Sequence, residues 1–248
     1  MKNLKELSIQ SLELARQAGA KTLPYFRSVN LKVTEKGQDS PLTAADLESN
    51  QVIVDGLAKM DSSIPIISEE NAQIPYAQRK DWKLFWIVDP LDGTKEFIAG
   101  IPEFTVNIAL IENGIPILGI VTAPALDLEY WATRSDGCYK NGERVYSRKQ
   151  LDNRVALESR FHSKDIAPEM KSKYHIGSMD KVGSSLKFAK IAEGSADIYI
   201  RHNPIMEWDV AAGDALFRYS ARDGVRKSPL IYNQETLKIL SLVIGDDI

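Results

Sequence analysis

The sequence lacks the features that mark secreted or membrane-spanning proteins. Cys138 is the single cysteine among 248 residues, so the chain cannot form an internal disulfide, and no partner residue marks this thiol as reactive. No apolar run reaches the roughly 18 residues that a membrane-spanning helix requires, and the N-terminus has no secretory signal pattern. We therefore expect a soluble, cytoplasmic protein, with contact to the inner face of a membrane left open.

An excess of positive charge is also absent. The chain has 31 lysines and arginines against 34 aspartates and glutamates, a formal charge of −3. No basic field is present to recruit nucleic acid or an anionic membrane, so a nucleic-acid partner is not expected. No repeat, low-complexity tract or flexible linker divides the chain, which predicts a single unit of 248 residues.

Two amphipathic helices are predicted near the N-terminus. The first has apolar residues at spacings near 3.6 and is expected to end around Gly19. The second is expected to start near Thr43, because Thr43-Ala-Ala-Asp46 resembles a capping box. An apolar stripe with helical spacing follows at Ile53 and Leu57.

Further along the chain the pattern favours strands alternating with helices. The apolar run LFWIV (84–88) predicts a buried strand. Residues 105–111 and 117–122 predict a β-hairpin, because the intervening Asn113-Gly114 tolerates the positive φ of a type I′ turn. The remaining expected elements are strands at 129–133, 155–159 and 197–201, a helix near 184–193 and a helix from about 209. This alternation predicts an α/β layout with layered helices and sheets.

Acidic residues cluster beside apolar runs. Glu69 and Glu70 follow IPII (64–67), Asp89 and Asp92 follow LFWIV, and Asp209 precedes Val-Ala-Ala. Carboxylates at the ends of buried strands lose solvation and repel one another unless a cation compensates. Mg²⁺ prefers oxygen ligands, and no histidine or cysteine lies nearby to suggest zinc. The pattern indicates a Mg²⁺ site, which is also what phosphoryl transfer requires.

An alternative interpretation treats each acidic motif separately. Asp-Pro and Asp-Gly mark turns, and Glu69-Glu70 reads as solvated surface charge. The joint occurrence of the motifs favours the metal site over these separate readings. Gly93-Thr94 adds to it, because a glycine followed by a helix start presents backbone N–H groups to an anion.

At these residues the sequence resembles the inositol monophosphatase superfamily of Mg²⁺-dependent phosphatases. WIVDPLDGT (86–94) and WDVAAGDAL (208–216) are similar to its two signatures, and the resemblance extends to about Ser220. It implies one phosphatase domain over residues 1–248, with a metal-binding lobe at about 1–150 and an α/β lobe at about 151–248.

Within the superfamily the chain resembles the CysQ-type 3′(2′),5′-bisphosphate nucleotidases. The segments that carry this resemblance are DSPLTAAD (39–46), ISEE (67–70), DPLDGTKEFI (89–98), EFTVNIALI (103–111), PILGIVTAP (116–124) and GSSLKF (183–188). The implied reaction removes the 3′-phosphate of adenosine 3′,5′-bisphosphate to give AMP, and the implied pathway is sulfur assimilation.

The resemblance assigns roles residue by residue. One metal would be held by Glu69, Asp89 and the backbone carbonyl of Leu91, and a second by Asp89, Asp92 and Asp209, for a total of two or three Mg²⁺ ions. Three further residues would act on the attacking water. Glu70 would orient it, and Thr94 paired with Asp46 would help to activate it; the competing interpretation of Asp46 is a helix cap.

Substrate contacts are implied at Gly93, Thr94, Ser184, Lys187, Arg201 and Asp209. Ser184 and Lys187 lie three residues apart at a predicted helix start, where a second, non-reacting phosphate could bind; the alternative is an ordinary helix start with a surface lysine. His162 could add to this basic pocket. Trp208 is expected to pack in the core behind Asp209.

Three other questions stay open at this level. The segments 218–227 and 231–245 lack the glycine-rich turn and the proline-glycine element usual in the family, and these segments are where the nucleoside side of the pocket could differ from that of the family. The alternative enzymatic function is that of an inositol or sugar monophosphatase. The alternative without catalysis is a regulator that keeps the fold and binds a metal or nucleotide but does not react. The state of association is expected to be a monomer or a homodimer.

Overall fold

A seven-stranded sheet forms the centre of the protein. The structure, a computed structural model, describes residues 3–26, 41–161 and 166–245. In this sheet, strands that follow one another in sequence are also neighbours in space, the first pair parallel and the others antiparallel. The strands are β1 (Ile66–Ser68), β2 (Leu84–Asp92), β3 (Thr105–Glu112), β4 (Ile115–Ala123), β5 (Leu128–Thr133), β6 (Gly137–Lys140) and β7 (Glu143–Arg144).

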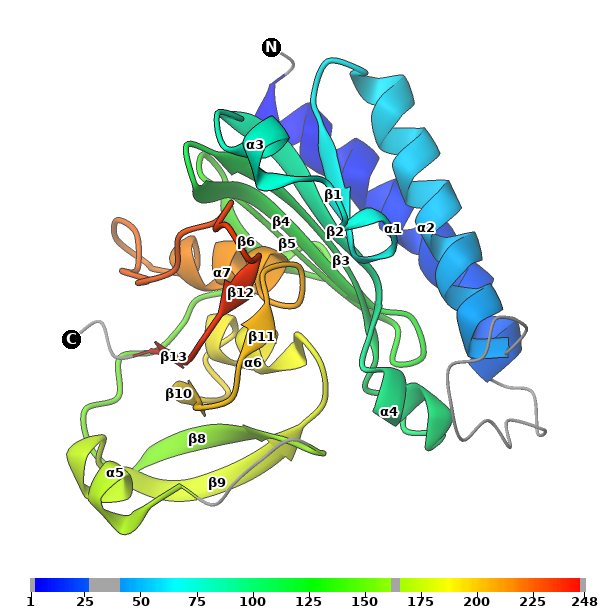
Figure 1. Cartoon of the computed structure of the whole chain (residues 1–248). Helices are drawn as coiled ribbons and strands as arrows, with labels where there is room; N and C mark the ends of the chain where they lie inside the picture. Colours follow the sequence, from blue (N-terminus) through cyan, green and yellow to red (C-terminus); the bar gives the residue numbers. More distant parts are fainter. Residues whose placement is uncertain (1–2, 27–40, 162–165, 246–248) are drawn as a thin grey trace.

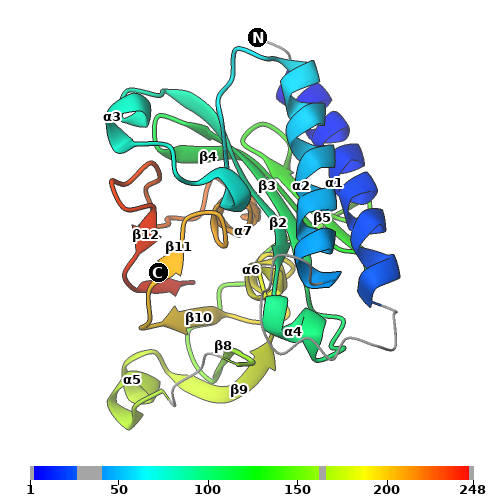
Figure 2. The same cartoon turned by 45° about the vertical axis from the view of Figure 1, so that its right-hand side comes forward.

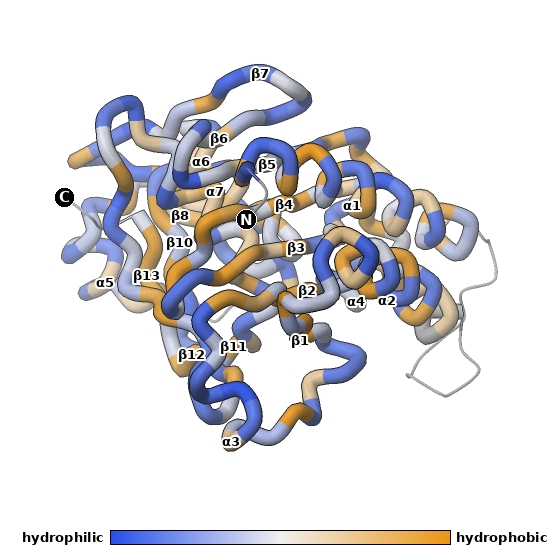
Figure 3. The backbone as a smooth tube through the Cα atoms, turned by 90° about the horizontal axis from the view of Figure 1, so that it is seen from above, coloured by the Kyte–Doolittle hydropathy of each residue, from blue (hydrophilic) through white to orange (hydrophobic). Residues whose placement is uncertain are grey.

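The two N-terminal helices cover one face of this sheet (Figure 1). They are α1 (Leu4–Phe26) and α2 (Pro41–Met60). The predicted stripe is confirmed, because Ile53 and Leu57 are fully buried in a cluster with residues of β2, β3 and β4. Figure 3 shows the same separation, with hydrophobic residues concentrated in the central strands and hydrophilic ones in the outer segments.

The expected ends of both helices need correction. Helix α1 continues through Gly19 to Phe26. Gly19 is needed for packing, since a Cβ there would lie 3.0 Å from Pro124 Cβ. Helix α2 begins two residues before Thr43, so Thr43 lies within the helix and is not its cap. Asp46 therefore sits in the second turn, beyond the position from which it could close the predicted capping box.

The predicted hairpin is confirmed in detail. Asn113 has φ 51° and Gly114 has φ 76°, the left-handed conformation at both turn positions that a type I′ turn requires. The strands it joins are the central members of the sheet. They are almost entirely buried, because helices pack on both of their faces.

The opposite face of the large sheet packs against the C-terminal part of the chain. Helices α6 (Leu186–Ala192) and α7 (Ala211–Arg218) lie there, and beyond them is a four-stranded sheet in the order β13-β10-β8-β9. Its strands are β8 (Arg154–Ser159), β9 (Ile176–Val182), β10 (Ile198–Arg201) and β13 (Leu242–Ile244). The result is the layered, mixed α/β architecture that the sequence predicted.

Short elements complete the fold. Helix α4 (Thr94–Ile98) lies at the junction of the two sheets, close to α6 (Figure 2). The others are η1 (Glu69–Asn71), α3 (Tyr76–Arg79), α5 (Pro168–Lys173), β11 (Ile205–Met206) and β12 (Lys238–Ile239). Within the described ranges, no helix has both the length and the apolar character needed to cross a membrane.

Candidate active site

An irregularity in β2 brings two aspartates to the same side of the large sheet. Asp89 pairs with Asn107 and Asp92 with Thr105 on β3, so three residue steps on β2 face two on β3. Side chains three positions apart in a regular strand point to opposite faces, and a bulge re-aims them. Pro90 lies within this bulge, and Ser49 Oγ on α2 donates to its carbonyl at 2.7 Å.

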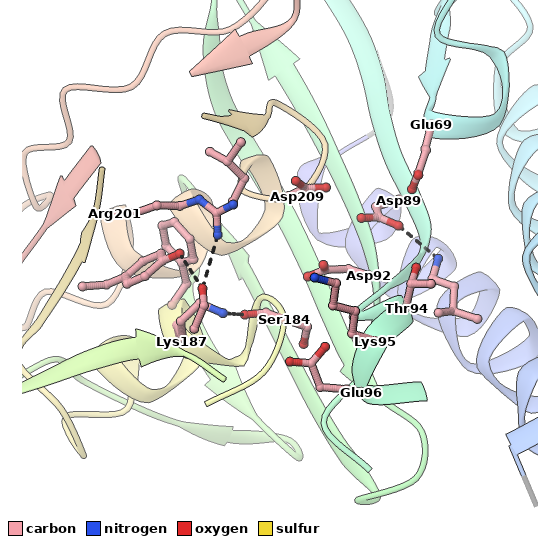
Figure 4. Close-up of a pocket in the computed structure, with 16 residues that line it drawn as sticks. Glu69, Asp89, Asp92, Thr94, Lys95, Glu96, Ser184, Lys187, Arg201 and Asp209 are labelled. Carbon is pink, nitrogen blue, oxygen red and sulfur yellow. Dashed lines mark hydrogen bonds between the residues drawn. The ribbon is translucent and has the colours of Figure 1, made fainter. Parts of the chain in front are cut away.

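The bulge opens into a cavity of about 280 Å³ between the two sheets. Most of the predicted site residues line it, although they come from five separate stretches of the chain (Figure 4). These residues are Glu69, Asp89, Leu91, Asp92, Gly93, Thr94, Ser184, Lys187, Arg201 and Asp209.

Two predicted catalytic residues lie outside the lining of this cavity. Glu70 is exposed, and its backbone N–H donates to Ser68 Oγ at 3.4 Å. Asp46 is 2% exposed on α2. Its charge nevertheless acts on the site, because Asp46 is one of the carboxylates that raise the pKa of Asp89. The water-activating roles of Asp46 and Glu70 stay predictions.

Three carboxylates converge at the base of the cavity. Oxygen atoms of Asp89, Asp92 and Asp209 all lie within 4.8 Å of one another. Burial raises the pKa of Asp89 well above its ordinary value, and the neighbouring charges, led by Glu69, raise it further. Burial likewise raises the pKa of Asp92, and burial together with the Asp92 charge raises the pKa of Asp209 to about 7. Such a cluster is costly to ionise without a compensating cation.

The donor set fits a divalent cation that prefers oxygen. Asp89 Oδ1 accepts the backbone N–H of Leu91 at 3.0 Å, while Asp89 Oδ2 is buried and has no hydrogen-bond partner among the described residues. Asp209 Oδ2 accepts the N–H of Met206 at 3.2 Å. Each of these carboxylates thus has an oxygen fixed by the backbone, and Asp89 keeps another available for a cation.

Two cationic side chains line another part of the same cavity (Figure 4). Lys187 is 5% exposed, and its Nζ donates to the carbonyls of Val182 and Ser184. It is therefore a buried pocket residue and not the surface lysine of the alternative interpretation. Arg201 donates from Nε to Asn203 O at 3.1 Å and from one terminal nitrogen to Ser159 Oγ at 3.2 Å. The hydrogen bonds of both cations go to neutral acceptors, and the Lys187 charge also lowers the pKa of Asp92 against the rise caused by burial, so Lys187 lies within electrostatic reach of the carboxylate cluster.

Close packing between α4 and the turn before α6 explains the glycine at position 93. Gly93 has φ 94° and precedes α4, and a Cβ there would lie 3.1 Å from Glu103 O and 3.2 Å from Ser184 Cβ. Ser184 itself has φ 44°. Its Oγ is buried with no partner in the described part of the chain, so it can bind a group that enters the cavity.

The sequence reasoning missed six lining residues: Lys95, Glu96, Ser159, Phe188, Tyr199 and Ile205. Lys95 and Glu96 could have been found, because they directly follow the Asp-Gly-Thr motif. Tyr199 and Ser159 gave no signal, since an alternating strand pattern does not reveal which face meets the cavity. Trp208 is 7% exposed and packs in the core as expected. His162 lies outside the described residues.

Fold and site together define a layered α/β protein with an acidic, cation-binding pocket between two sheets. The model of the inositol monophosphatase family matches residues 3–218. The chain belongs to this family, whose enzymes are metal-dependent phosphatases.

Named relatives are similar over nearly the whole chain. The 3′(2′),5′-bisphosphate nucleotidase CysQ of Salmonella typhimurium is 41% identical over 213 residues, which are 84% of this chain and 85% of that protein. The CysQ of Haemophilus influenzae is 32% identical over 246 residues, 92% and 88% of the two chains. The crystal structure of CysQ from Bacteroides thetaiotaomicron has a TM-score of 0.82 at 32% identity and covers 98% of each chain.

Proposed function

We propose that the protein is a Mg²⁺-dependent 3′(2′),5′-bisphosphate nucleotidase that converts adenosine 3′,5′-bisphosphate to AMP and phosphate. The observation that carries this proposal is the composition of the cavity between the two sheets. Three carboxylates meet in one part of it, and Lys187 and Arg201 line another. Such a cavity suits a substrate with one phosphate to hydrolyse and a second to hold. The names of the CysQ relatives support this assignment.

The acidic part of the cavity would hold two or three Mg²⁺ ions. Glu69, Asp89 and the carbonyl of Leu91 would hold one, and Asp89, Asp92 and Asp209 another. When bound, these cations neutralise phosphate oxygens and strengthen water as a nucleophile. The raised pKa values of the three aspartates support this role, because a site that keeps carboxylates so close needs a cation to keep them ionised.

Thr94 and Asp46 would manage the proton of the attacking water. Thr94 begins α4 and lines the cavity, and Asp46 is buried within electrostatic reach of Asp89. A hydroxyl paired with a carboxylate can accept a proton as water attacks phosphorus and the bond between phosphorus and the 3′ oxygen breaks; the 3′ oxygen takes up a proton and leaves as the hydroxyl of AMP. Glu70, whose side chain lies at the exposed start of η1, would orient this water from the solvent side.

The cationic part would bind the phosphate that does not react. Lys187 has three N–H donors and uses two on backbone carbonyls, so one N–H stays available to a phosphate, while its charge also acts on Asp92, whose pKa it lowers against the rise caused by burial. Arg201 and the hydroxyl of Ser184 complete the proposed contacts to this phosphate, whereas the backbone at Gly93 would contact the phosphate that the cations hold. An inositol monophosphate has no second phosphate and would gain nothing from this part of the cavity.

The test is a side-by-side assay of phosphate release from adenosine 3′,5′-bisphosphate and inositol 1-phosphate with Mg²⁺. We expect a kcat/KM for the bisphosphate about 10–10²-fold higher, the scale set by one charge-assisted contact to the second phosphate. Better turnover of inositol 1-phosphate would refute the nucleotidase assignment in favour of an inositol-type phosphatase. Absence of turnover with either substrate would favour a silent binding protein.

A further inference from the structure

Ser185 occupies a central position beneath the carboxylate cluster, although its side chain does not line the cavity. It is 2% exposed and lies in the turn between β9 and α6. Its Oγ accepts a hydrogen bond from Asn107 Nδ2 at 2.9 Å. The same oxygen lies 2.7 Å from the carbonyl of Asp209 and 3.1 Å from Asp92 Oδ2, and can donate its hydrogen to either.

These three partners come from parts of the chain that are distant in sequence. Asn107 is on β3 opposite Asp89, Asp92 ends β2, and Asp209 precedes α7. One hydroxyl therefore connects the large sheet to the C-terminal part of the chain at the point where two of the three clustered carboxylates meet. Asn107 acts as the donor that fixes the Ser185 oxygen as an acceptor, so the Ser185 hydrogen is directed toward Asp92 and Asp209.

The turn that carries Ser185 is itself anchored. Glu103 accepts two hydrogen bonds from the Arg160 guanidinium, at 2.9 and 2.7 Å, and a third from the backbone N–H of Gly183 at 2.7 Å. A Cβ on Gly183 would lie 2.6 Å from Glu103 O. The turn thus lies directly against the segment before β3, which leaves Ser185 little freedom to move away from Asp92.

We infer that Ser185 is a positioning residue that sets the separation and orientation of Asp92 and Asp209 for cation binding. This inference rests on the proposed function, because it takes these two carboxylates to be metal ligands. Carboxylates of like charge repel one another and rotate apart unless an outer hydrogen-bond donor fixes them. The Ser185 oxygen lies within hydrogen-bond distance of both Asp92 Oδ2 and the Asp209 carbonyl, and its one hydrogen is shared between these two acceptors, while Asp92 Oδ1 stays free of this restraint.

The test is Mg²⁺ binding to metal-stripped protein, measured by isothermal titration calorimetry. Ser185→Ala should raise the Kd for Mg²⁺ by about 10–100-fold, the usual cost of removing an outer-shell partner. The matched control is Ser184→Ala, which removes a hydroxyl from the same turn that contacts no carboxylate of the cluster. Its Kd for Mg²⁺ should stay within about twofold of the wild type, since its expected effect is on substrate binding.

A second variant keeps the test decisive if Ser185→Ala is poorly folded. Asn107→Ala leaves the Ser185 hydroxyl but removes its donor, and should weaken Mg²⁺ binding by a smaller factor. In the double variant the two losses are expected to interact, because Ser185 and Asn107 contact each other and both also act on Asp92.

The outcomes separate this inference from the proposed function. Unchanged Mg²⁺ affinity in Ser185→Ala and Asn107→Ala, with normal binding by the wild type, would overturn the positioning role alone. Failure of the wild type to bind Mg²⁺ would overturn the metal site and with it this inference.

Discussion

The backbone N–H of Leu91 donates to Asp89 Oδ1 at 3.0 Å, and this contact makes the two oxygens of the Asp89 carboxylate unequal. One oxygen is fixed by the bulge in β2. The other, Oδ2, is buried with no hydrogen-bond partner in the described residues. A carboxylate held in this way carries negative charge that the chain itself does not compensate, and the first prediction follows from it.

Asp89→Asn should have opposite effects on stability and on activity. In metal-free protein at neutral pH, burial and the neighbouring carboxylates oppose the ionisation of Asp89 that the unfolded chain allows, so removing this ionisable group should raise the temperature of thermal unfolding by several degrees, corresponding to about 1–3 kcal/mol. Hydrolysis at saturating Mg²⁺ should fall by more than about 10²-fold, because an amide cannot neutralise a cation. Near-normal turnover would show that Asp89 is not a metal ligand.

Asp214→Asn is the matched control for this prediction. Asp214 is also fully buried, but its Oδ2 accepts Arg218 Nε at 2.9 Å and the Tyr232 hydroxyl at 3.1 Å. Neutralising it leaves Arg218 without its charged partner, so the same substitution should lower thermal stability. A rise in the melting temperature of both variants would mean that the gain at Asp89 does not come from the carboxylate cluster.

Thr94→Ala should separate the chemical step from metal binding. Loss of the hydroxyl should lower kcat by roughly 10²–10⁴-fold, the usual range for general acid–base assistance. The Mg²⁺ concentration for half-maximal activity should change little, and Thr94→Ser, which keeps the hydroxyl, should recover most of the rate. A variant whose main defect is a large rise in the Mg²⁺ requirement would place Thr94 among the metal ligands instead.

Lys187→Ala tests the proposed site for the second phosphate. It should raise KM for adenosine 3′,5′-bisphosphate by an amount equivalent to about 1.5–3 kcal/mol, the value of a charge-assisted hydrogen bond, and affect monophosphates far less. Lys190→Ala on the same helix is the control, because Lys190 does not line the cavity. Equal losses on both substrate classes would indicate damage to the turn that Lys187 supports through Val182 and Ser184.

Stabilisation by Mg²⁺ should increase with pH. The folded-state pKa values of Asp89, Asp92 and Asp209 are raised, so the metal-free folded protein binds more protons than the unfolded chain. Its stability therefore falls as pH rises from the ordinary aspartate value of 3.8 toward the Asp209 value of about 7. Mg²⁺ replaces those protons, so the melting-temperature increase it causes should be larger at pH 8 than at pH 5.5. An increase that does not depend on pH would contradict the carboxylate site.

Local sequence patterns were sufficient to predict those elements whose conformation depends on residues close together in the sequence. The Asn113-Gly114 turn and the apolar stripe of α2 follow from backbone preference and from periodicity, and the structure has both. The acidic motifs could be grouped for the same reason, because each lies beside an apolar run. Their convergence depends on the pairing of β1 with β2 and on α7, which places Asp209 beside them.

What the sequence could not provide depends on contacts between distant segments. Gly19 was predicted to end a helix, but it lies inside α1 and packs against Pro124. Strand β2 continues past Pro90, because this proline lies in a bulge of the strand. The motif GSSLKF contains Ser185 but assigned it no role, since its importance lies in three partners brought together by the fold. Strand β13, which pairs with β10, likewise arises from a long-range contact.

The central claim is that bound divalent cations at the Asp89, Asp92 and Asp209 cluster drive hydrolysis of a nucleoside bisphosphate. The most direct measurement is phosphate release from adenosine 3′,5′-bisphosphate by metal-stripped protein as Mg²⁺ is titrated back, with the nucleotide product identified. We predict no turnover without Mg²⁺, saturable recovery on its addition, and AMP as the product. Turnover that persists in excess chelator, or no recovery at any Mg²⁺ concentration, would contradict the account.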